Sequence, residues 1–291
     1  MVKKKQKRKQ PITAKTISGN AKFKHSRVET ARLIRRFHVL NKELAKCRSS
    51  TEPDCIKKEQ AILSEMEAMG GLDWYQKASQ LGQSKARGGD SSKWLIQTLK
   101  TYCKEEQQQV LKDHQFIRVL DVGAVAPDNY KSYTSWIKAK PIDLNPQHPD
   151  IEQQDFLRMK PPSDDGDKFD IISLSLVINF VGDPKDRGQM LIHTRNFLSS
   201  PILCKNRLHY LFLVVPLPCI TNSRYMTHEH LLSMMTSIGY TKCIHYHFSN
   251  KLAYYLFELT KLSKINTVWK KRVLPGKEGG GRNNFAVVIE K

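Results

Sequence analysis

The sequence predicts an α/β fold, in which a parallel sheet is closed by an antiparallel strand and preceded by a helical N-terminal extension. From about residue 116 onward, short apolar segments alternate with helical patterns, as in parallel strands joined by crossover helices. Near the end, strand-like segments at 243–248 and 252–259 have no helix between them, so they are expected to pair antiparallel. The 291 residues suffice for one large domain and an appendage.

Residues 1–27 form a basic tail with ten lysines or arginines and no acidic residue. The tail has too few apolar residues to form a core, so it is predicted to be disordered. Its KKKQKRK stretch suits a nuclear import signal, a phosphate-binding arm, both, or a solvated terminus. We therefore expect a protein of the nucleus and nucleolus.

Residues 28–90 are predicted to be a helical extension and connector. Apolar residues recur at helical spacing over 28–69, with a break near Pro53, and two glycines end the second helix. This pattern predicts a helical hairpin. The connector over 72–90 mixes aromatic, basic and glycine residues, which suits a loop reaching a ligand or RNA as well as an ordinary link.

Residues 91–291 are predicted to be the main domain. A helix is expected over 91–109, and the first strand follows at 116–121. The remaining strands are expected near 139–143, 169–175, 208–215, 243–248, 252–259 and 284–290, with helices near 185–199 and 227–238.

The composition bounds the function. A formal net charge of +20, half of it from the tail, favours an anionic partner such as nucleic acid. The six cysteines include no CxxC pair, and no histidine cluster has zinc spacing, so no metal site is expected. The longest apolar run, 210–215, is too short to cross a bilayer, so a soluble protein with no membrane partner is expected.

The strongest local signal is Asp121-Val122-Gly123-Ala124, where a buried strand runs into a glycine turn. Ligands of open α/β sheets bind at the carboxyl ends of such strands, and a glycine lets the backbone approach a ligand closely. The second and third glycines of a dinucleotide fingerprint are missing, as is a phosphate-binding loop. The turn therefore suits a nucleotide cofactor without a pyrophosphate.

Three later segments extend this signal. Asp143, followed by Leu144, lies 20 residues after Gly123, the spacing at which an acid after the second strand meets a ribose diol. Asp155 and Phe156 suit an adenine amino group and an adenine face. The apolar strand that contains Ser173 and Leu174 ends in small polar residues, where a substrate is expected. Each segment alone is also common in ordinary structural roles, and their order and spacing favour a joint site.

These segments resemble Rossmann-like class I S-adenosylmethionine-dependent methyltransferases. More closely, they resemble the fungal family that makes N1-methyladenosine in 25S ribosomal RNA and that includes an animal S-adenosylmethionine sensor upstream of a growth-controlling kinase complex. The resemblance covers roughly residues 90–290 and rests on LDVGA, IDLNPQHPDIEQQDF and FDIISLSLVINFVGDPKDRGQMLIHTRNFL. It implies that S-adenosyl-L-methionine is the cofactor. The cofactor residues implied are Gly123 and Asp143 first, then Asp121, Ala124, Leu144, Asp155, Phe156, Ser173 and Leu174.

The resemblance implies methylation of adenine N1 in large-subunit 25S rRNA during ribosome assembly, with pre-ribosomal particles as partners. N1 carries a lone pair at neutral pH, so alignment and electrostatics suffice without a general base. The candidate catalytic residues are Asn179, for the base edge, and Phe180, for stacking; a strand-end cap and a core ring are the alternatives. Basic and aromatic candidates for gripping RNA are Lys85, Arg87, Lys131, Tyr133, Trp136, Lys138, Trp269, Lys270, Lys271 and Arg272.

Two further functions remain open at the level of the sequence. One is a non-catalytic S-adenosylmethionine sensor that regulates a signalling complex. The other is a ribosome-assembly scaffold with a vestigial pocket. The basic tail favours the rRNA enzyme.

Overall fold

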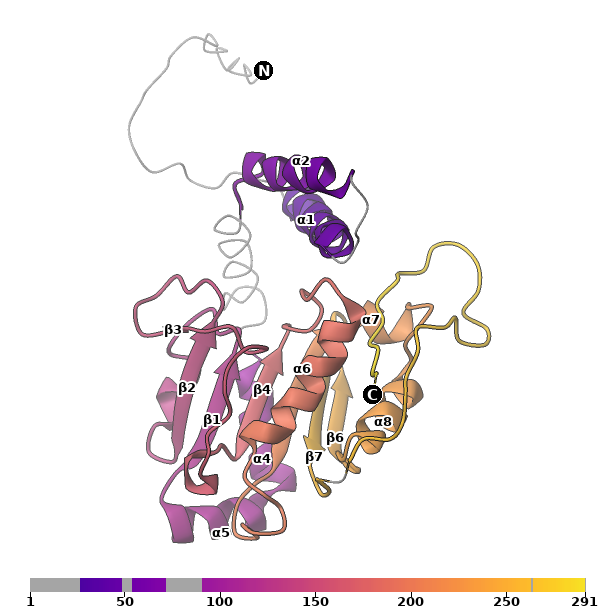
Figure 1. The fold of residues 1–291 in the computed structure, drawn as a ribbon. Coiled ribbons are helices and arrows are strands. Elements are labelled where there is room, and N and C mark those ends of the chain that lie inside the picture. The colour runs from indigo at the N-terminus through magenta and orange to yellow at the C-terminus, as the bar shows by residue number, and fades with distance from the viewer. Residues whose placement is uncertain (1–26, 49–53, 72–90, 263, 291) are drawn as a thin grey trace, which may run out of the picture.

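The computed structural model describes residues 27–48, 54–71, 91–262 and 264–290 (Figure 1). The predictions for the tail, the connector, Lys85 and Arg87 lie outside these residues. None of the described helices is both long and apolar enough to cross a membrane.

The centre of the fold is a seven-stranded sheet in the order β3-β2-β1-β4-β5-β7-β6. Only β7 runs against its neighbours, pairing antiparallel with β5 and β6, whereas the pairs from β3 to β5 are parallel. This is the predicted α/β fold with an antiparallel closing strand. The strands are β1 (Ile117–Val122), β2 (Ile137–Asp143), β3 (Glu152–Gln153), β4 (Ile171–Ser175), β5 (Tyr210–Pro216), β6 (Lys242–Phe248) and β7 (Leu252–Glu258).

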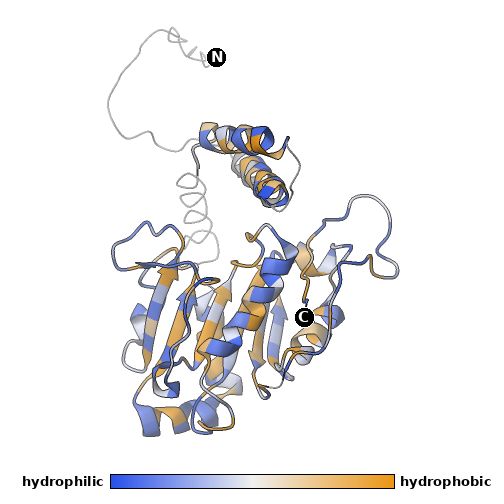
Figure 2. Cartoon of the chain, in the orientation of Figure 1, coloured by the Kyte–Doolittle hydropathy of each residue, from blue (hydrophilic) through white to orange (hydrophobic). Residues whose placement is uncertain are grey.

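Helices cover both faces of this sheet, which explains why its central strands are mostly apolar (Figure 2). One face packs on α4 (Ser92–Tyr102) and the other on α6 (Pro184–Phe197) and α8 (His228–Ser237). The predicted helix over 91–109 is interrupted at Cys103, after which α5 (Lys104–His114) begins. The short elements are η2 (Lys131–Tyr133), η3 (Asp165–Asp167) and α7 (Pro218–Thr221).

The strand predicted near 284–290 does not join the sheet. Residues 285–289 are buried, but their backbone bonds to Pro184 and Trp269 instead, through Val288 N to Pro184 O at 2.8 Å and Ile289 N to Trp269 O at 3.0 Å. Gly188 of α6 permits this contact, because an added Cβ would lie 1.8 Å from the Val288 carbonyl oxygen. The apolar pattern correctly indicated burial, but the segment packs on a helix.

Arg187 connects this C-terminal segment to the loop after β4. It is 1% exposed and donates to the carbonyl oxygens of Val181 at 2.8 Å and Ala286 at 2.7 Å. Its guanidinium also lies 4.9 Å from the centre of the Phe285 ring. Burial lowers the pKa of Arg187 to about 10, so the side chain remains a cation at neutral pH.

The two helices predicted before the main domain are α1 (Arg27–Arg48) and α2 (Cys55–Ala68). They pack as a hairpin around Leu40, Leu44 and Ile62. The hairpin lies beyond the carboxyl ends of the parallel strands (Figure 1). It contacts the loop after β4, because Asn41 Nδ2 donates to the Phe180 carbonyl oxygen at 2.9 Å. The division of the chain into domains stays a prediction.

Candidate functional site

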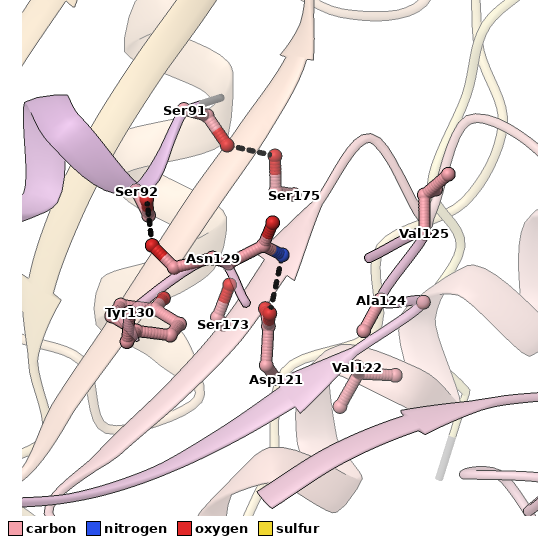
Figure 3. Close-up of a pocket in the computed structure, with 11 residues that line it drawn as sticks. Ser91, Ser92, Asp121, Val122, Ala124, Val125, Asn129, Tyr130, Ser173 and Ser175 are labelled. Carbon is pink, nitrogen blue, oxygen red and sulfur yellow. Dashed lines mark hydrogen bonds between the residues drawn. The ribbon is translucent and has the colours of Figure 1, made fainter. Parts of the chain in front are cut away.

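A polar pocket lies at the carboxyl ends of β1 and β4 (Figure 3). The two strands are neighbours, and Asp121 of β1 pairs in register with Ser173 of β4. Four of the predicted cofactor residues, Asp121, Gly123, Ala124 and Ser173, are thus brought together. The pocket is lined by Ser91, Ser92, Asp121, Val122, Gly123, Ala124, Val125, Asn129, Tyr130, Ser173 and Ser175.

Gly123 makes the tight turn that the sequence predicts. Its φ is +71°, a value that favours glycine, and an added Cβ would lie 2.7 Å from Val177 Cγ2. The amides of Gly123 and Ala124 both donate to the Ile142 carbonyl oxygen, at 2.8 and 3.0 Å. These bonds hold the turn against the end of β2.

Asp121 is 5% exposed and accepts a hydrogen bond from Asn129 Nδ2 at 2.9 Å. Ser92 Oγ in turn donates to the Asn129 carbonyl oxygen at 3.0 Å, and the hydroxyls of Ser91 and Ser175 lie 2.7 Å apart (Figure 3). Sequence reasoning did not identify Ser91, Ser92 or Asn129 as site residues. None belongs to a motif, and Ser91 is 84 residues from Ser175.

Asp143 and Leu144 lie at the end of β2, beside the glycine turn. Asp143 Oδ1 accepts from the Asn145 amide at 2.8 Å, and its carbonyl oxygen accepts from the Gln154 amide at 2.9 Å. Leu144 is 62% exposed, which leaves a large apolar side chain open next to the carboxylate. Both residues therefore lie at the edge of the sheet where the sequence predicts the cofactor.

Asp155 and Phe156 follow β3. Asp155 is partly buried and accepts from the Leu157 amide at 3.0 Å. Phe156 is 3% exposed and packs 5.1 Å from Phe197 and 5.2 Å from His193, measured between ring centres. The ring has no open face to offer an adenine, so the prediction of Phe156 as a stacking residue is corrected: it is a core residue.

The side chains of Ser173 and Leu174 lie on opposite faces of the sheet. Successive side chains of a strand point to opposite faces of the sheet. Ser173 lines the pocket, whereas Leu174 is fully buried in the core against α6 and α8. Leu174 was predicted as a cofactor residue, but its side chain faces the core and does not line the pocket.

The loop after β4 forms the other side of the site. Leu176 has a φ of +58°, a left-handed conformation that is unfavourable for a branched side chain, and such strain concentrates at functional sites. Asn179 Oδ1 is buried and has no hydrogen-bond partner in the part of the chain that is described. Phe180 is partly buried and packs against Phe37 of α1.

Several of the predicted RNA-binding residues lie away from this edge. The Trp136 carbonyl oxygen accepts from the amide of Ile117, the first residue of β1, and Lys138 pairs with Arg118. Both are at the amino ends of the strands, opposite the pocket. Trp269 donates to Ser237 Oγ at 2.8 Å and packs on the core, so it has a structural role. Among the described residues there is no group of three or more metal-ligating side chains.

We compared the chain with protein families of known function. The 25S rRNA (adenine(2142)-N(1))-methyltransferase family, Bmt2, matches residues 60–287 of the chain. The chain belongs to this family. The matched segment spans the sheet, the glycine turn and the loop after β4.

Two curated relatives are similar over most of this chain. The chain is 38% identical over 283 residues to the 25S rRNA adenine-N(1) methyltransferase of Schizosaccharomyces pombe, covering 95% of this chain and 98% of the relative. It is 34% identical to the 25S rRNA (adenine(2142)-N(1))-methyltransferase of Saccharomyces cerevisiae, covering 78% of this chain and 63% of that protein.

A solved structure of an N-methyltransferase, NodS from Bradyrhizobium japonicum WM9 in complex with S-adenosyl-L-homocysteine, is similar over 55% of this chain and 89% of its own. The identity is 12% and the TM-score 0.34, so this likeness is weak.

Proposed function

We propose that this protein transfers a methyl group from S-adenosyl-L-methionine to N1 of an adenine in large-subunit ribosomal RNA, in the nucleolus, during ribosome assembly. The observation that carries the proposal is the meeting of three predicted segments at one edge of the sheet. Gly123 and Ala124 bond to Ile142 of β2, and Asp121 lies beside Ser173 of β4. Family membership supports the reaction, and the basic tail supports the location.

The residues present at the ends of β1 and β2, which we call the cofactor side, fit this cofactor. Gly123 lines the pocket, and the turn suits only glycine there, because an added Cβ would lie 2.7 Å from Val177 Cγ2. We assign the ribose to Asp143, since a carboxylate accepts hydrogen bonds from both hydroxyls of a diol. Leu144 offers an exposed apolar surface to the adenine ring. The amino-acid part then faces Asp121, whose carboxylate suits an ammonium group.

S-Adenosylmethionine, when bound, supplies a methyl group attached to a positively charged sulfur. The lone pair of adenine N1 attacks the methyl carbon, and the electron pair of the broken carbon–sulfur bond stays on the sulfur. The acceptor base becomes a cation, so the chain need not remove a proton from N1. What the protein must supply is alignment. Because N1 is a Watson–Crick position, a paired adenine has to be unpaired before it enters.

Asn179 is the residue we assign to the edge of the target base, and we call the loop after β4 that contains it the base side. A buried amide oxygen without a partner is costly in a folded protein, and Asn179 Oδ1 is such an atom. The adenine N6 amino group is a donor, and a hydrogen bond from it to this oxygen would bring the neighbouring N1 into the site. Phe180, whose carbonyl oxygen is held by Asn41, would lie beside the same base.

The test is methyl transfer to large-subunit rRNA prepared from cells that lack the enzyme. Reverse transcription should stop at one adenine after incubation with the wild-type protein, because a methyl on N1 blocks pairing. Asp143→Asn should weaken cofactor binding about 30-fold through loss of charge-assisted hydrogen bonds. Asp150→Asn is the matched control, because it makes the same change at an exposed acid in the loop between β2 and β3.

Asn179 has its own pair of variants. Asn179→Asp retains the acceptor oxygen, whereas Asn179→Leu removes it in a side chain of similar size, so the aspartate variant should keep more activity. Cofactor binding by calorimetry should be unchanged in both. Tight cofactor binding with no methyl transfer to any rRNA would overturn the proposal in favour of a sensor, and failure to bind the cofactor would favour a scaffold.

A further inference from the structure

A loop of strongly positive charge lies beside the base side of the site. We call residues 270–284 the basic loop; it is the projecting loop near α7 in Figure 1. Five of its residues are lysine or arginine and one, Glu278, is acidic. Lys270, Lys271 and Arg272 are exposed, and no carboxylate forms an ion pair with them within the described residues. Exposed cations without acidic partners favour binding of an anion.

The basic loop is held in place by the segment that follows β5. Arg224 donates to the carbonyl oxygens of Gly279 and Arg282, both at 2.8 Å, and to Asn284 Oδ1 at 2.8 Å. The Leu274 amide donates to the Arg224 carbonyl oxygen at 2.9 Å. The side-chain amides of Asn222 and Asn283 add bonds to the carbonyl oxygens of Gly281 at 3.1 Å and Pro218 at 2.6 Å, so the loop is held against the segment that follows β5.

The position of the loop relative to the base side is set by Arg187. This residue bonds at once to Val181, which follows Phe180, and to Ala286, which follows the basic loop. One guanidinium group thus bridges the end of the loop and the segment assigned to the target base. The basic loop and the segment assigned to the target base are therefore neighbours on the surface.

A group of aromatic side chains lies next to the basic loop, beginning at Tyr225. Lys271 lies 4.8 Å from the centre of the Tyr225 ring, and three residues later His228 contacts Tyr246 at 4.4 Å and Phe248 at 5.5 Å between ring centres. Tyr246 is 48% exposed and Phe248 37% exposed. Both belong to β6, the edge strand, whose last residues lie at the same edge of the sheet as the end of β5.

We propose that the basic loop and the aromatic residues Tyr246 and Phe248 form a binding surface for single-stranded RNA that flanks the target adenine. Cations that track a phosphate backbone, combined with exposed rings on which bases stack, are the usual means of binding single strands. The inference rests on the proposed function for its biological substrate, but the surface itself is testable without catalysis.

The first experiment measures binding of a fluorescent oligouridine of about 16 nucleotides, a length suited to a single-strand site. This probe contains no adenine, so it bypasses the base pocket. The full-length triple variant Lys270→Ala, Lys271→Ala, Arg272→Ala should bind about tenfold more weakly, and the slope of log Kd against log salt should fall by about 2, since each phosphate contact to a single strand contributes about 0.7. The matched control changes Lys104, Lys112 and Lys205 to alanine, which are exposed residues of α5 and of the loop before β5.

The second experiment tests the rings. Tyr246→Ala with Phe248→Ala should weaken oligouridine binding about tenfold with little change in the salt slope. Tyr102→Ala is the control, because Tyr102 is 52% exposed and stacks on His245 of the same strand. Calorimetry of cofactor binding, unchanged in every variant, verifies that each one is folded.

Equal binding by the triple variant and its lysine control would overturn the inference, as would stronger binding to vesicles of acidic lipid than to RNA. The proposed function fails separately. If the wild-type protein binds oligouridine through these residues but leaves rRNA unmethylated, the inference of an RNA-binding surface is supported and the methyltransferase proposal is wrong. If rRNA is methylated with an unchanged KM in the triple variant, only the surface is wrong.

Discussion

The carboxyl ends of β1 and β2 and the carboxyl end of β4 lie at one edge of one sheet, but their supporting contacts come from different parts of the chain. On the cofactor side the contacts are local: Gly123 bonds to Ile142, and Asp143 bonds to Gln154. On the base side they are distant, since Asn41 and Phe180 are 139 residues apart. The cofactor side is thus encoded largely by spacing within one stretch of sequence, with Ser92 of α4 as a distant support through Asn129, and the base side by the tertiary fold.

The largest effect is expected from substitution of Arg187, the buried residue that holds the loop on the base side. Arg187→Met should lower the free energy of unfolding by about 3 kcal/mol, because the carbonyl groups of Val181 and Ala286 lose their buried donor. Urea unfolding measures this loss. Arg195→Met is the comparison on the same helix; an equal loss in both variants would show that Arg187 has no special role in joining the two segments.

The next effect concerns the cofactor side. Gly123→Ala should weaken cofactor binding about 100-fold, because it combines a left-handed backbone with a Cβ only 2.7 Å from Val177 Cγ2. Calorimetry with S-adenosylhomocysteine provides the measurement. Gly276→Ala is a matched control, since Gly276 has a φ of +70° and open space around it. If adding Val177→Ala restored full binding, crowding rather than backbone conformation would be the cause.

These two residues show what the sequence reveals and what it does not. Gly123 was predictable, because a glycine directly after an apolar strand is typical of a tight turn at a ligand site and Asp143 follows at an informative distance. Arg187 was not, since an arginine in a helical pattern normally faces solvent. Its burial depends on Val181 and Ala286, which are adjacent only after folding.

The sheet was predictable for a related reason. Its strands read as apolar runs because helices cover both faces, so the pattern reports burial. Burial alone does not identify the partner, however. That is why the segment 285–289 was mistaken for a strand, and why Phe156 and Leu174 were assigned to the ligand although both are core residues.

A smaller effect should separate the two sides of the site. Asn41→Ala removes the hydrogen bond from α1 to the Phe180 carbonyl oxygen, and a neutral hydrogen bond contributes about 1 kcal/mol, or roughly fivefold. We expect kcat/KM for rRNA methylation to fall by about this factor while cofactor affinity stays constant. Arg48→Ala, which breaks an exposed ion pair with Glu59 in the same hairpin, should change neither. A loss of cofactor affinity in Asn41→Ala would mean that the hairpin supports both sides.

The smallest effect is expected at the opposite edge of the sheet, where His209 precedes β5. The residue is 6% exposed, and burial lowers its pKa below the ordinary value of 6.5. As pH falls below 6.5, the unfolded chain therefore takes up a proton at this position before the folded protein does, so stability falls. In His209→Gln, unfolding free energies measured from about pH 7.5 to about pH 5 should decline less steeply than in the wild type. An identical slope in the variant and the wild type would show that His209 does not contribute to acid sensitivity.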